Sequence, residues 1–248
     1  MCRHVAYLGP PIPIADLVID APHSLVEQSY APLDMRGGGR INADGFGIGW
    51  HPENGGAIAR YRRSLPIWSD ASLPSLARMS RSGAFLAAVR SATVGMPVVE
   101  TASAPFTDGH WLFSHNGFVP GWPASLGELA ATVPVTELMT LDAPSDSALI
   151  WVLVLRRLAA GAEPVEAVVS VVHDIESVAP GSRLNLLLLD QEQIVATTVT
   201  HSLSVRHGDG AVVVSSEPLT GESEWHPVAD RQVVVATPSR VQISPLEG

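Results

Sequence analysis

The chain has 248 residues, a formal net charge of −10 and 46% hydrophobic residues, which suits one large α/β or α+β domain. The acidic charge argues against nucleic acid or an anionic membrane surface as a partner. All 15 basic residues are arginine, which excludes Schiff-base lysines and phosphate-loop lysines. We therefore expect neither pyridoxal phosphate nor a phosphate-loop nucleotide.

Cysteine and histidine usage narrows the class of protein further. One cysteine in the chain excludes an intramolecular disulfide framework and cysteine-rich zinc sites. The nine histidines lack metal-ligand spacing, so we expect no metal and no cofactor. No secretory signal or membrane-spanning run is evident, and we expect a cytoplasmic protein.

The first half of the chain alternates short strands and helices. Local patterns predict a first strand and two short helices separated by Pro22. A glycine-rich loop follows these helices, and then a hairpin, a further helix and two apolar strands. In chain order these are strand 2–8, helices 14–20 and 23–31, loop 37–39, strands 46–50 and 57–62, helix 70–82, and strands 85–91 and 111–115.

The second half predicts two helices followed by hairpins. Helix 145–160 begins at Pro144-Ser145 and ends before Gly161, and helix 164–178 packs against it. The predicted hairpin strands are 184–189 with 194–200, 203–207 with 212–215, and 232–237 with 241–244. Many antiparallel strands and two central helices indicate an α+β protein with packed sheets, and we expect a single domain over residues 1–248.

Cys2 is the first residue that suggests chemistry. Removal of Met1 would leave a cysteine that carries both a thiol and a free α-amine. An amine with a pKa of about 7.7–8.0 can accept the proton of a thiol with a pKa of about 8.5, so one residue supplies nucleophile and base. The alternative is an inert, buried cysteine, and Cys2 alone favours that alternative.

One segment has glycine at alternate positions, with a spacing that superficially resembles a phosphate loop. Its sequence is Asn42-Ala43-Asp44-Gly45-Phe46-Gly47-Ile48-Gly49-Trp50. No lysine follows, and the glycines do not open a helix. We expect the glycines to let this strand approach another backbone closely.

Three later motifs each have a structural and a catalytic interpretation. Arg90, at the end of an apolar strand, suits a carboxylate clamp or a structural ion pair. Asn116-Gly117 is typical of a turn, which alone is the better interpretation, but these residues also suit an oxyanion hole. Ser145-Asp146 at a helix start is a good cap and helix-dipole partner, and Asp146 also suits binding of an ammonium group.

The order Cys2, Arg90 with Thr93, Asn116-Gly117 and Asp146 resembles the class II glutamine amidotransferase family of N-terminal-nucleophile hydrolases, over nearly the whole chain. The resemblance implies a four-layer αββα sandwich with two antiparallel sheets between helical layers. It also implies that Cys2 attacks a γ-glutamyl carbonyl. The expected site residues are the nucleophile, two oxyanion-hole residues and three residues that bind the glutamyl head group, namely Cys2, Asn116, Gly117, Arg90, Thr93 and Asp146.

Two departures from the family pattern affect the substrate. The family often has Arg-Trp-Ala-Thr-His where this chain has Arg90-Ser91-Ala92-Thr93-Val94, and a later histidine is replaced near Ala104. The chain also ends where the family domain is complete, without a synthetase domain. A small γ-glutamyl amide substrate with no obligatory synthetase partner is therefore our first expectation.

Within the family, several segments resemble amidohydrolases of ergothioneine synthesis, which remove glutamate from γ-glutamyl-hercynylcysteine S-oxide. These segments are 2–9, 42–47, 89–97, 103–106 and 114–117. The trimethylammonium group of such a substrate favours aromatic faces, with candidates Trp50, Phe46, Trp111 and Trp122, although buried tryptophan is commoner. The alternatives are a glutaminase subunit that supplies ammonia to a separate synthetase, and a catalytically silent binding domain.

Overall fold

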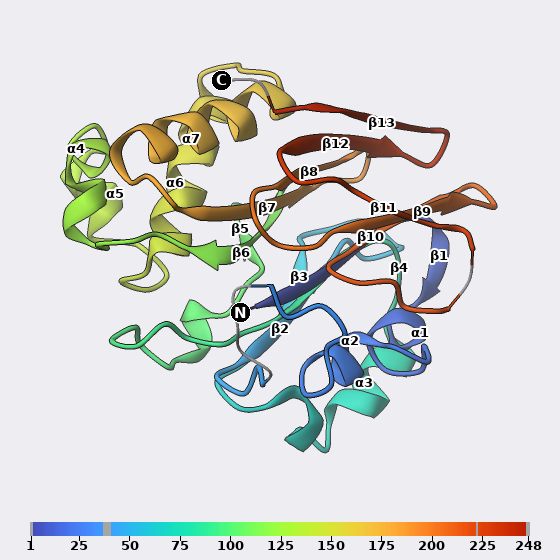
Figure 1. Cartoon of the computed structure of the whole chain (residues 1–248). Coiled ribbons are helices and arrows are strands. Elements are labelled where there is room, and N and C mark those ends of the chain that lie inside the picture. Colours follow the sequence, from blue (N-terminus) through green and yellow to red (C-terminus); the bar gives the residue numbers. More distant parts are fainter. Residues whose placement is uncertain (1, 37–40, 222, 247–248) are drawn as a thin grey trace.

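The structure is a computed structural model in which residues 2–36, 41–221 and 223–246 are described. Two antiparallel sheets lie face to face (Figure 1). Sheet A has the order β11 (Trp225–Pro227), β9 (Ser204–Gly208), β10 (Ala211–Ser215), β1 (Arg3–Pro13), β4 (Arg81–Val89), β2 (Phe46–Trp50) and β3 (Ala59–Arg63). Sheet B has the order β13 (Arg240–Pro245), β12 (Gln232–Thr237), β8 (Ile194–Thr198), β7 (Arg183–Leu189), β6 (Leu112–Phe118) and β5 (Phe106–Thr107).

Strand β1 shows why the sheets need covering on both sides. Val5 and Tyr7 pack in a cluster with residues of the helices beside sheet A, whereas Ala6 and Leu8 pack against residues of sheet B. All four are at most 4% exposed, so β1 is apolar on both faces rather than alternating with polar residues. Burial of both faces requires a layer on each side of sheet A.

Helices provide the two outer layers (Figure 1). Helices α1 (Ala15–Val18), α2 (Leu25–Gln28) and α3 (Leu73–Met79) lie beside sheet A, and α6 (Asp146–Ala159) and α7 (Pro164–Val178) cover sheet B. The remaining short helices are α4 (Gly127–Ala130), α5 (Val135–Leu138) and 3₁₀ turns at Ile67–Ser69, Glu100–Ala102 and Ala124–Leu126. The expected four-layer αββα sandwich is therefore confirmed.

The glycines of β2 allow close contact with the neighbouring layer. A Cβ atom on Gly47 would lie 2.3 Å from the carbonyl oxygen of Ala104, and one on Gly49 would lie 2.5 Å from a methyl group of Leu112. Neither distance is sterically possible without movement of the neighbour, and a backbone carbonyl cannot swing away as a side-chain end can. The close-approach interpretation of this strand is confirmed, and the phosphate-loop interpretation has no support here.

Most predicted elements are present with shifted ends, and two predictions were wrong. The helix expected over 70–82 is α3, which ends at Met79, because Arg81 and Ser82 already pair with β1. Asn116-Gly117 is not a turn: both residues lie within β6 and pair with Asn185 and Leu184 of β7. The predicted glycine-rich loop 37–39 lies outside the described residues.

Helix α6 shows how local sequence determines one end of the fold. The Ser145 hydroxyl accepts a hydrogen bond from the backbone N–H of Ala148 at 3.3 Å, so Ser145 caps the helix as expected. Asp146 follows in the first turn, where its charge suits the helix dipole.

Within the described part of the chain, no helix is both long and apolar enough to cross a bilayer.

Candidate active site

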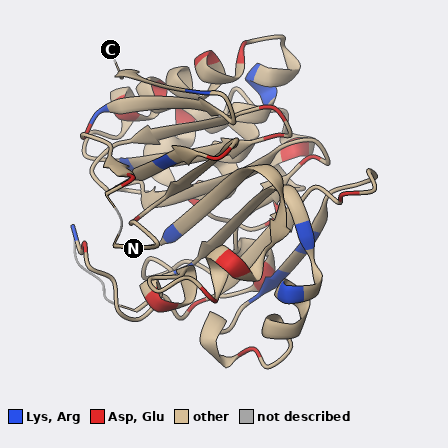
Figure 2. Ribbon diagram, turned by 90° about the vertical axis from the view of Figure 1, so that its right-hand side faces the viewer, with Lys and Arg blue, Asp and Glu red and all other residues tan. Residues whose placement is uncertain are grey.

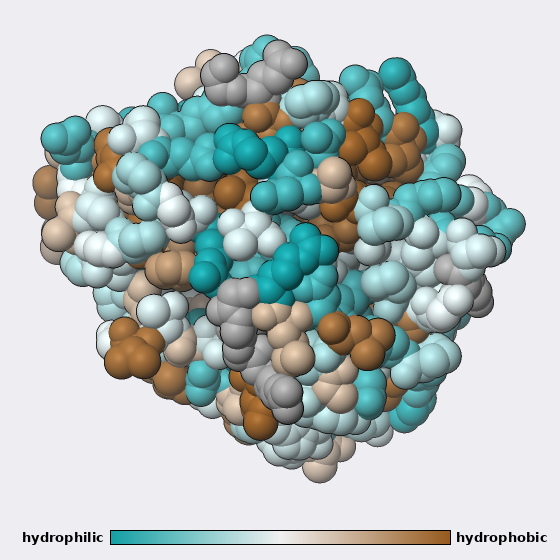
Figure 3. Space-filling view, viewed as in Figure 1, coloured by the Kyte–Doolittle hydropathy of each residue, from teal (hydrophilic) through white to brown (hydrophobic). Residues whose placement is uncertain are grey.

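Cys2 lies immediately before β1, at one end of the sandwich. Its Sγ atom is 3.8 Å from the carbonyl oxygen of Ser91, and the residue is half-buried. Hydrophilic and apolar residues are mixed near the centre of the face on which β1 begins (Figures 1 and 3). Met1 lies outside the described residues, so the expected removal of Met1 stays a prediction.

A buried ion pair anchors the strand directly after Cys2. Arg3 and Glu217 are 1% and 2% exposed, and a guanidinium nitrogen lies 2.9 Å from a carboxylate oxygen. Glu217 also accepts hydrogen bonds from the backbone N–H groups of Leu33 and Asp34 and lies 2.6 Å from Nε2 of His23. Burial raises the pKa of Glu217, but these hydrogen bonds and the charge of Arg3 outweigh burial and leave the pKa lowered.

Arg90 and Thr93 belong to the loop that follows β4. The Asp44 carboxylate accepts a hydrogen bond from the N–H of Ala92 at 2.8 Å, which holds this loop against the start of β2. The Arg90 guanidinium donates to the carbonyl oxygen of Pro97 at 2.8 Å. No carboxylate of the described residues forms an ion pair with Arg90, so the ion-pair alternative finds no support in the structure.

Asn116 and Gly117 lie on β6, a strand of sheet B, which is packed between sheet A and helices α6 and α7. The Asn116 side chain is fully buried, and neither its nitrogen nor its oxygen has a hydrogen-bond partner within the described part of the chain. A Cβ atom on Gly117 would lie 1.8 Å from the carbonyl oxygen of Arg183 and 2.5 Å from Nε2 of His115. Only glycine fits at position 117, and the Asn116 amide is buried without a hydrogen-bond partner among the described residues.

Asp146 is 6% exposed and accepts two backbone hydrogen bonds. The N–H of Val119 donates to Oδ2 at 3.1 Å, and the N–H of Ser147 donates to Oδ1 at 2.7 Å. Both donors fix the carboxylate without neutralising its charge. The helix-dipole and ligand-binding interpretations of Asp146 are therefore geometrically compatible.

Four of the six predicted residues line two hollows that residues of β6 border, whereas Asn116 and Gly117 line neither of them. Cys2 and Arg90 line a narrow hollow of about 20 Å³ with Ser114, His115 and Ser147. Thr93 and Asp146 line a hollow of about 610 Å³ that also has Trp122 on its wall. Asn116 and Gly117 lie on β6 between the residues that line the two hollows.

The hollow sizes suit a ligand that is narrow at one end. A volume of about 20 Å³ hardly exceeds that of a single water, whereas the larger hollow has the size of a small-molecule site. The hollow beside Cys2 therefore has room for little more than one small group, whereas the hollow at Thr93 and Asp146 has room for a larger ligand.

Two buried histidines near Cys2 were not identified from the sequence. Burial, followed by the charges of neighbouring basic groups, lowers the pKa of His4 and of His201 to about 3. His4 is fully buried, and its Nδ1 atom lies 3.2 Å from the Ser114 hydroxyl. Both imidazoles are thus neutral near pH 7.

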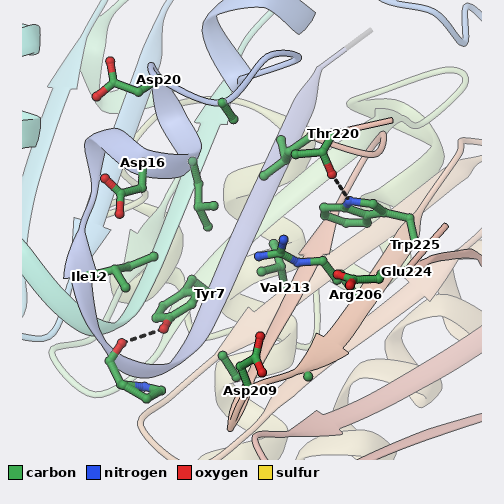
Figure 4. Close-up of a pocket in the computed structure, with 16 residues that line it drawn as sticks. Tyr7, Ile12, Asp16, Asp20, Arg206, Asp209, Val213, Thr220, Glu224 and Trp225 are labelled. Carbon is green, nitrogen blue, oxygen red and sulfur yellow. Dashed lines mark hydrogen bonds between the residues drawn. The ribbon is translucent and has the colours of Figure 1, made fainter. Parts of the chain in front are cut away.

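A third hollow, of about 570 Å³, lies on the outer face of sheet A and has none of the six predicted residues on its wall. Figure 4 shows Arg206 beside Trp225 on one side and Asp16 and Asp20 of the α1 region on the other. This hollow is separate from the arrangement around Cys2.

The aromatic candidates for a trimethylammonium group occupy different environments. Phe46 is fully buried and Trp111 is 9% exposed, each within an apolar core cluster, and Trp50 packs against one such cluster. Trp122 lines the larger hollow. The prediction was therefore wrong for Phe46 and Trp111.

The charged residues that the structure describes show no arrangement typical of a metal site. Acidic and basic segments alternate over the face seen in Figure 2. No group of three or more histidine, cysteine, aspartate or glutamate side chains among the described residues has the geometry to hold a metal ion.

A family model for class II glutamine amidotransferases matches residues 17–207. The chain belongs to this family. It is 41% identical to the γ-glutamyl-hercynylcysteine sulfoxide hydrolase of Mycolicibacterium smegmatis over 246 residues, which cover 99% of this chain and 100% of that protein. It is 38% identical to the protein of the same name from Mycobacterium tuberculosis over 248 residues, which cover 100% of this chain and 97% of that protein.

Two solved structures share the fold. A class II domain protein from Silicibacter pomeroyi superimposes with a TM-score of 0.71 at 22% identity, with complete coverage of both chains. The glutamine phosphoribosylpyrophosphate amidotransferase of Bacillus subtilis superimposes with a TM-score of 0.69 at 13% identity over 99% of this chain and 49% of that one. These likenesses agree with the αββα architecture.

Proposed function

We propose that this class II glutamine amidotransferase is an amidohydrolase that releases glutamate from γ-glutamyl-hercynylcysteine S-oxide. The observation that carries the proposal is the full-length identity of 38–41% to proteins with that hydrolase name. The hollows bordered by β6 support it, because Cys2 and Arg90 line the narrow one, and Thr93 and Asp146 line a wider one with room for a charged group.

In the proposed mechanism, the processed Cys2 attacks the γ-carbonyl carbon. Its α-amine takes the thiol proton, and the carbon–sulfur bond forms as the carbonyl π electrons move onto oxygen. The Asn116 side-chain amide and the Gly117 N–H stabilise that oxyanion, since an unpartnered buried amide has no competing hydrogen bond to break.

The tetrahedral intermediate then collapses, and the carbon–nitrogen bond breaks. The α-ammonium of Cys2 returns its proton to the departing amine, which leaves a γ-glutamyl thioester. A water molecule attacks the thioester with the α-amine as base, which releases glutamate and restores the thiol. No redox partner or additional reactant is needed.

Three residues bind the glutamyl head group in this proposal. Arg90 pairs with the α-carboxylate, Thr93 assists it, and Asp146 binds the α-ammonium. The Asp44 carboxylate accepts the N–H of Ala92 and so holds the loop that carries Arg90. Asp146 lies in the first turn of α6, so the residues that bind the α-carboxylate and the α-ammonium belong to two separate elements. A zwitterion clamped at both charges keeps its γ-amide directed at the thiol.

The proposal includes three expectations from the sequence. The substrate is a small molecule, no synthetase partner is required, and the protein works in the cytoplasm, where a single free cysteine suits the reducing conditions. Full-length alignment with relatives named as hydrolases supports the independence from a partner.

Glutamate release with two substrates tests the proposal. The N-terminally processed protein should release glutamate from γ-glutamyl-hercynylcysteine S-oxide far faster than from glutamine, and the Cys2→Ala variant should release none. Faster hydrolysis of glutamine would indicate a glutaminase subunit instead. Release from neither substrate, with Met1 shown to be absent by intact mass, would refute the enzymatic proposal.

A further inference from the structure

His115 joins the two halves of the proposed site. It lies on β6 directly before Asn116, and it is 4% exposed. Its Nε2 atom is 2.8 Å from the carbonyl oxygen of Arg183, and its Nδ1 atom is 2.9 Å from the hydroxyl of Ser147. The imidazole therefore spans from the neighbouring strand β7 to the first turn of helix α6.

The acceptor chemistry determines where the protons lie. A carbonyl oxygen only accepts, so Nε2 of His115 carries the proton and donates to Arg183. In a neutral imidazole, Nδ1 is then an acceptor, and the Ser147 hydroxyl donates to it. The Arg183 carbonyl thus determines the direction of the second hydrogen bond.

This direction has a consequence for Asp146. The Ser147 hydroxyl also lies 3.3 Å from Oδ1 of Asp146, but it has one proton, which it gives to His115. Asp146 therefore accepts only the backbone N–H groups of Ser147 and Val119. A carboxylate offers about four acceptor positions, so two remain for a ligand in the larger hollow that Asp146 lines.

We propose that His115 is a positioning residue that holds the Ser147 hydroxyl away from Asp146 and so reserves this carboxylate for the α-ammonium of the substrate. The inference rests on the proposed function, in which Asp146 binds that ammonium. His115 touches no reacting atom. Its effect on binding passes through Ser147.

The same imidazole also supports the oxyanion strand. The space in which a Gly117 side chain would lie is occupied by Nε2 of His115 and the carbonyl oxygen of Arg183. The His115–Arg183 hydrogen bond therefore packs beneath Gly117. Loss of this bond is expected to lower kcat, whereas release of the Ser147 hydroxyl is expected to raise KM.

A pair of substitutions separates these two effects. In His115→Leu, the Ser147 hydroxyl loses its acceptor and turns to Asp146, where it competes with the ammonium; KM should rise about tenfold, the equivalent of about one charge-assisted hydrogen bond. Adding Ser147→Ala removes the competing donor, so KM should return to within about twofold of wild type, while kcat stays low. Ser147→Ala alone should change KM by less than about threefold.

A structural role for His115 predicts the opposite order. If His115 only stabilises the fold, the double variant has a KM at least as high as His115→Leu, and that result overturns the inference. Asp146→Asn separates this failure from failure of the proposed function: an unchanged KM in Asp146→Asn refutes the head-group clamp itself. A raised KM in Asp146→Asn without rescue in the double variant refutes the His115 inference alone.

A spectroscopic test needs neither turnover nor a folded variant of His115. The ¹⁵N spectra of histidine-labelled wild-type and Ser147→Ala proteins near pH 7 would be compared, and the ring whose signals differ between them is assigned to His115. In the wild-type protein this ring should carry its proton on Nε2. A proton on Nδ1 of that ring would reverse the hydrogen bond to Ser147 and overturn the inference.

Discussion

Replacement of Glu217 by Gln should destabilise the protein strongly although Glu217 makes no contact with substrate in our account. Glu217 and Arg3 are 2% and 1% exposed and 2.9 Å apart. Removal of one partner from such a pair costs about 3–5 kcal/mol, because it leaves a buried charge uncompensated. This cost is a large part of the total free energy of unfolding, which is about 5–15 kcal/mol for a folded protein. At this chain length each kcal/mol lowers Tm by about 2–4 °C, so Tm should fall by about 6–20 °C.

The pH dependence of this effect has a definite sign. The pKa of Glu217 is lowered in the folded state, so its contribution is present above the unfolded pKa of about 4.3 and is lost as pH falls through the lower folded value. The stability difference between wild type and Glu217→Gln should therefore be constant near pH 7 and shrink below about pH 4.3.

Thermal and urea unfolding of both proteins measure the effect, with Glu176→Gln as a matched control. Glu176 pairs with Arg231 at 2.7 Å, but the side chains are 25% and 50% exposed, and such a pair contributes about 0–1 kcal/mol. A loss in Glu217→Gln no larger than in Glu176→Gln would refute the reasoning that burial makes the Arg3 pair important.

Three further predictions concern the site and its surroundings. Asn116→Ala should lower kcat about 10²–10³-fold with little change in KM, as expected for loss of one oxyanion donor, and a larger effect on KM than on kcat would contradict that role. Gly117→Ala should abolish activity and lower Tm, because its Cβ would lie 1.8 Å from the Arg183 carbonyl oxygen; an active, stable variant would contradict the close packing of β6 against β7. The free energy of unfolding should fall as the pH decreases from about 6.5 toward 3, because the pKa of His4 is lowered to about 3 in the folded state while the unfolded chain binds the proton. His4→Gln should make the free energy from urea unfolding less dependent on pH, by up to about 1.4 kcal/mol per pH unit. An unchanged slope would contradict neutral burial of His4.

Local sequence signals identified the elements whose ends have strong chemical markers. Helix α7 begins at Pro164 and ends at Val178, as predicted, because proline suits the first turn of a helix and the apolar residues recur at helical spacing. Ser145 similarly marked the start of α6. These signals act within a few residues and need no information about the rest of the fold.

Asn116-Gly117 shows where local reasoning fails. The dipeptide favours a turn by itself, but pairing with Asn185 and Leu184 of β7 keeps it in a strand. Tertiary pairing overrides local preference here. The family resemblance nevertheless identified both residues as site candidates, because it depends on the order of motifs and not on the local backbone.

The supporting contacts of the site could not be read from the sequence. His115 and Ser147 are 32 positions apart, and Arg3 and Glu217 are 214 apart, so nothing local links either pair. His4 stands in an apolar strand, where a histidine is usually a satisfied core residue. Such contacts depend on which strands become neighbours, which is a property of the complete sheet.

Mass spectrometry of the acyl-enzyme tests the central claim most directly. The processed protein would be mixed briefly with γ-glutamyl-hercynylcysteine S-oxide, quenched in acid and digested. The account predicts one γ-glutamyl group as a thioester on the peptide that begins with Cys2, and none in Cys2→Ala. Glutamate release without this adduct, or with Met1 still attached to the active protein, would contradict an N-terminal cysteine nucleophile.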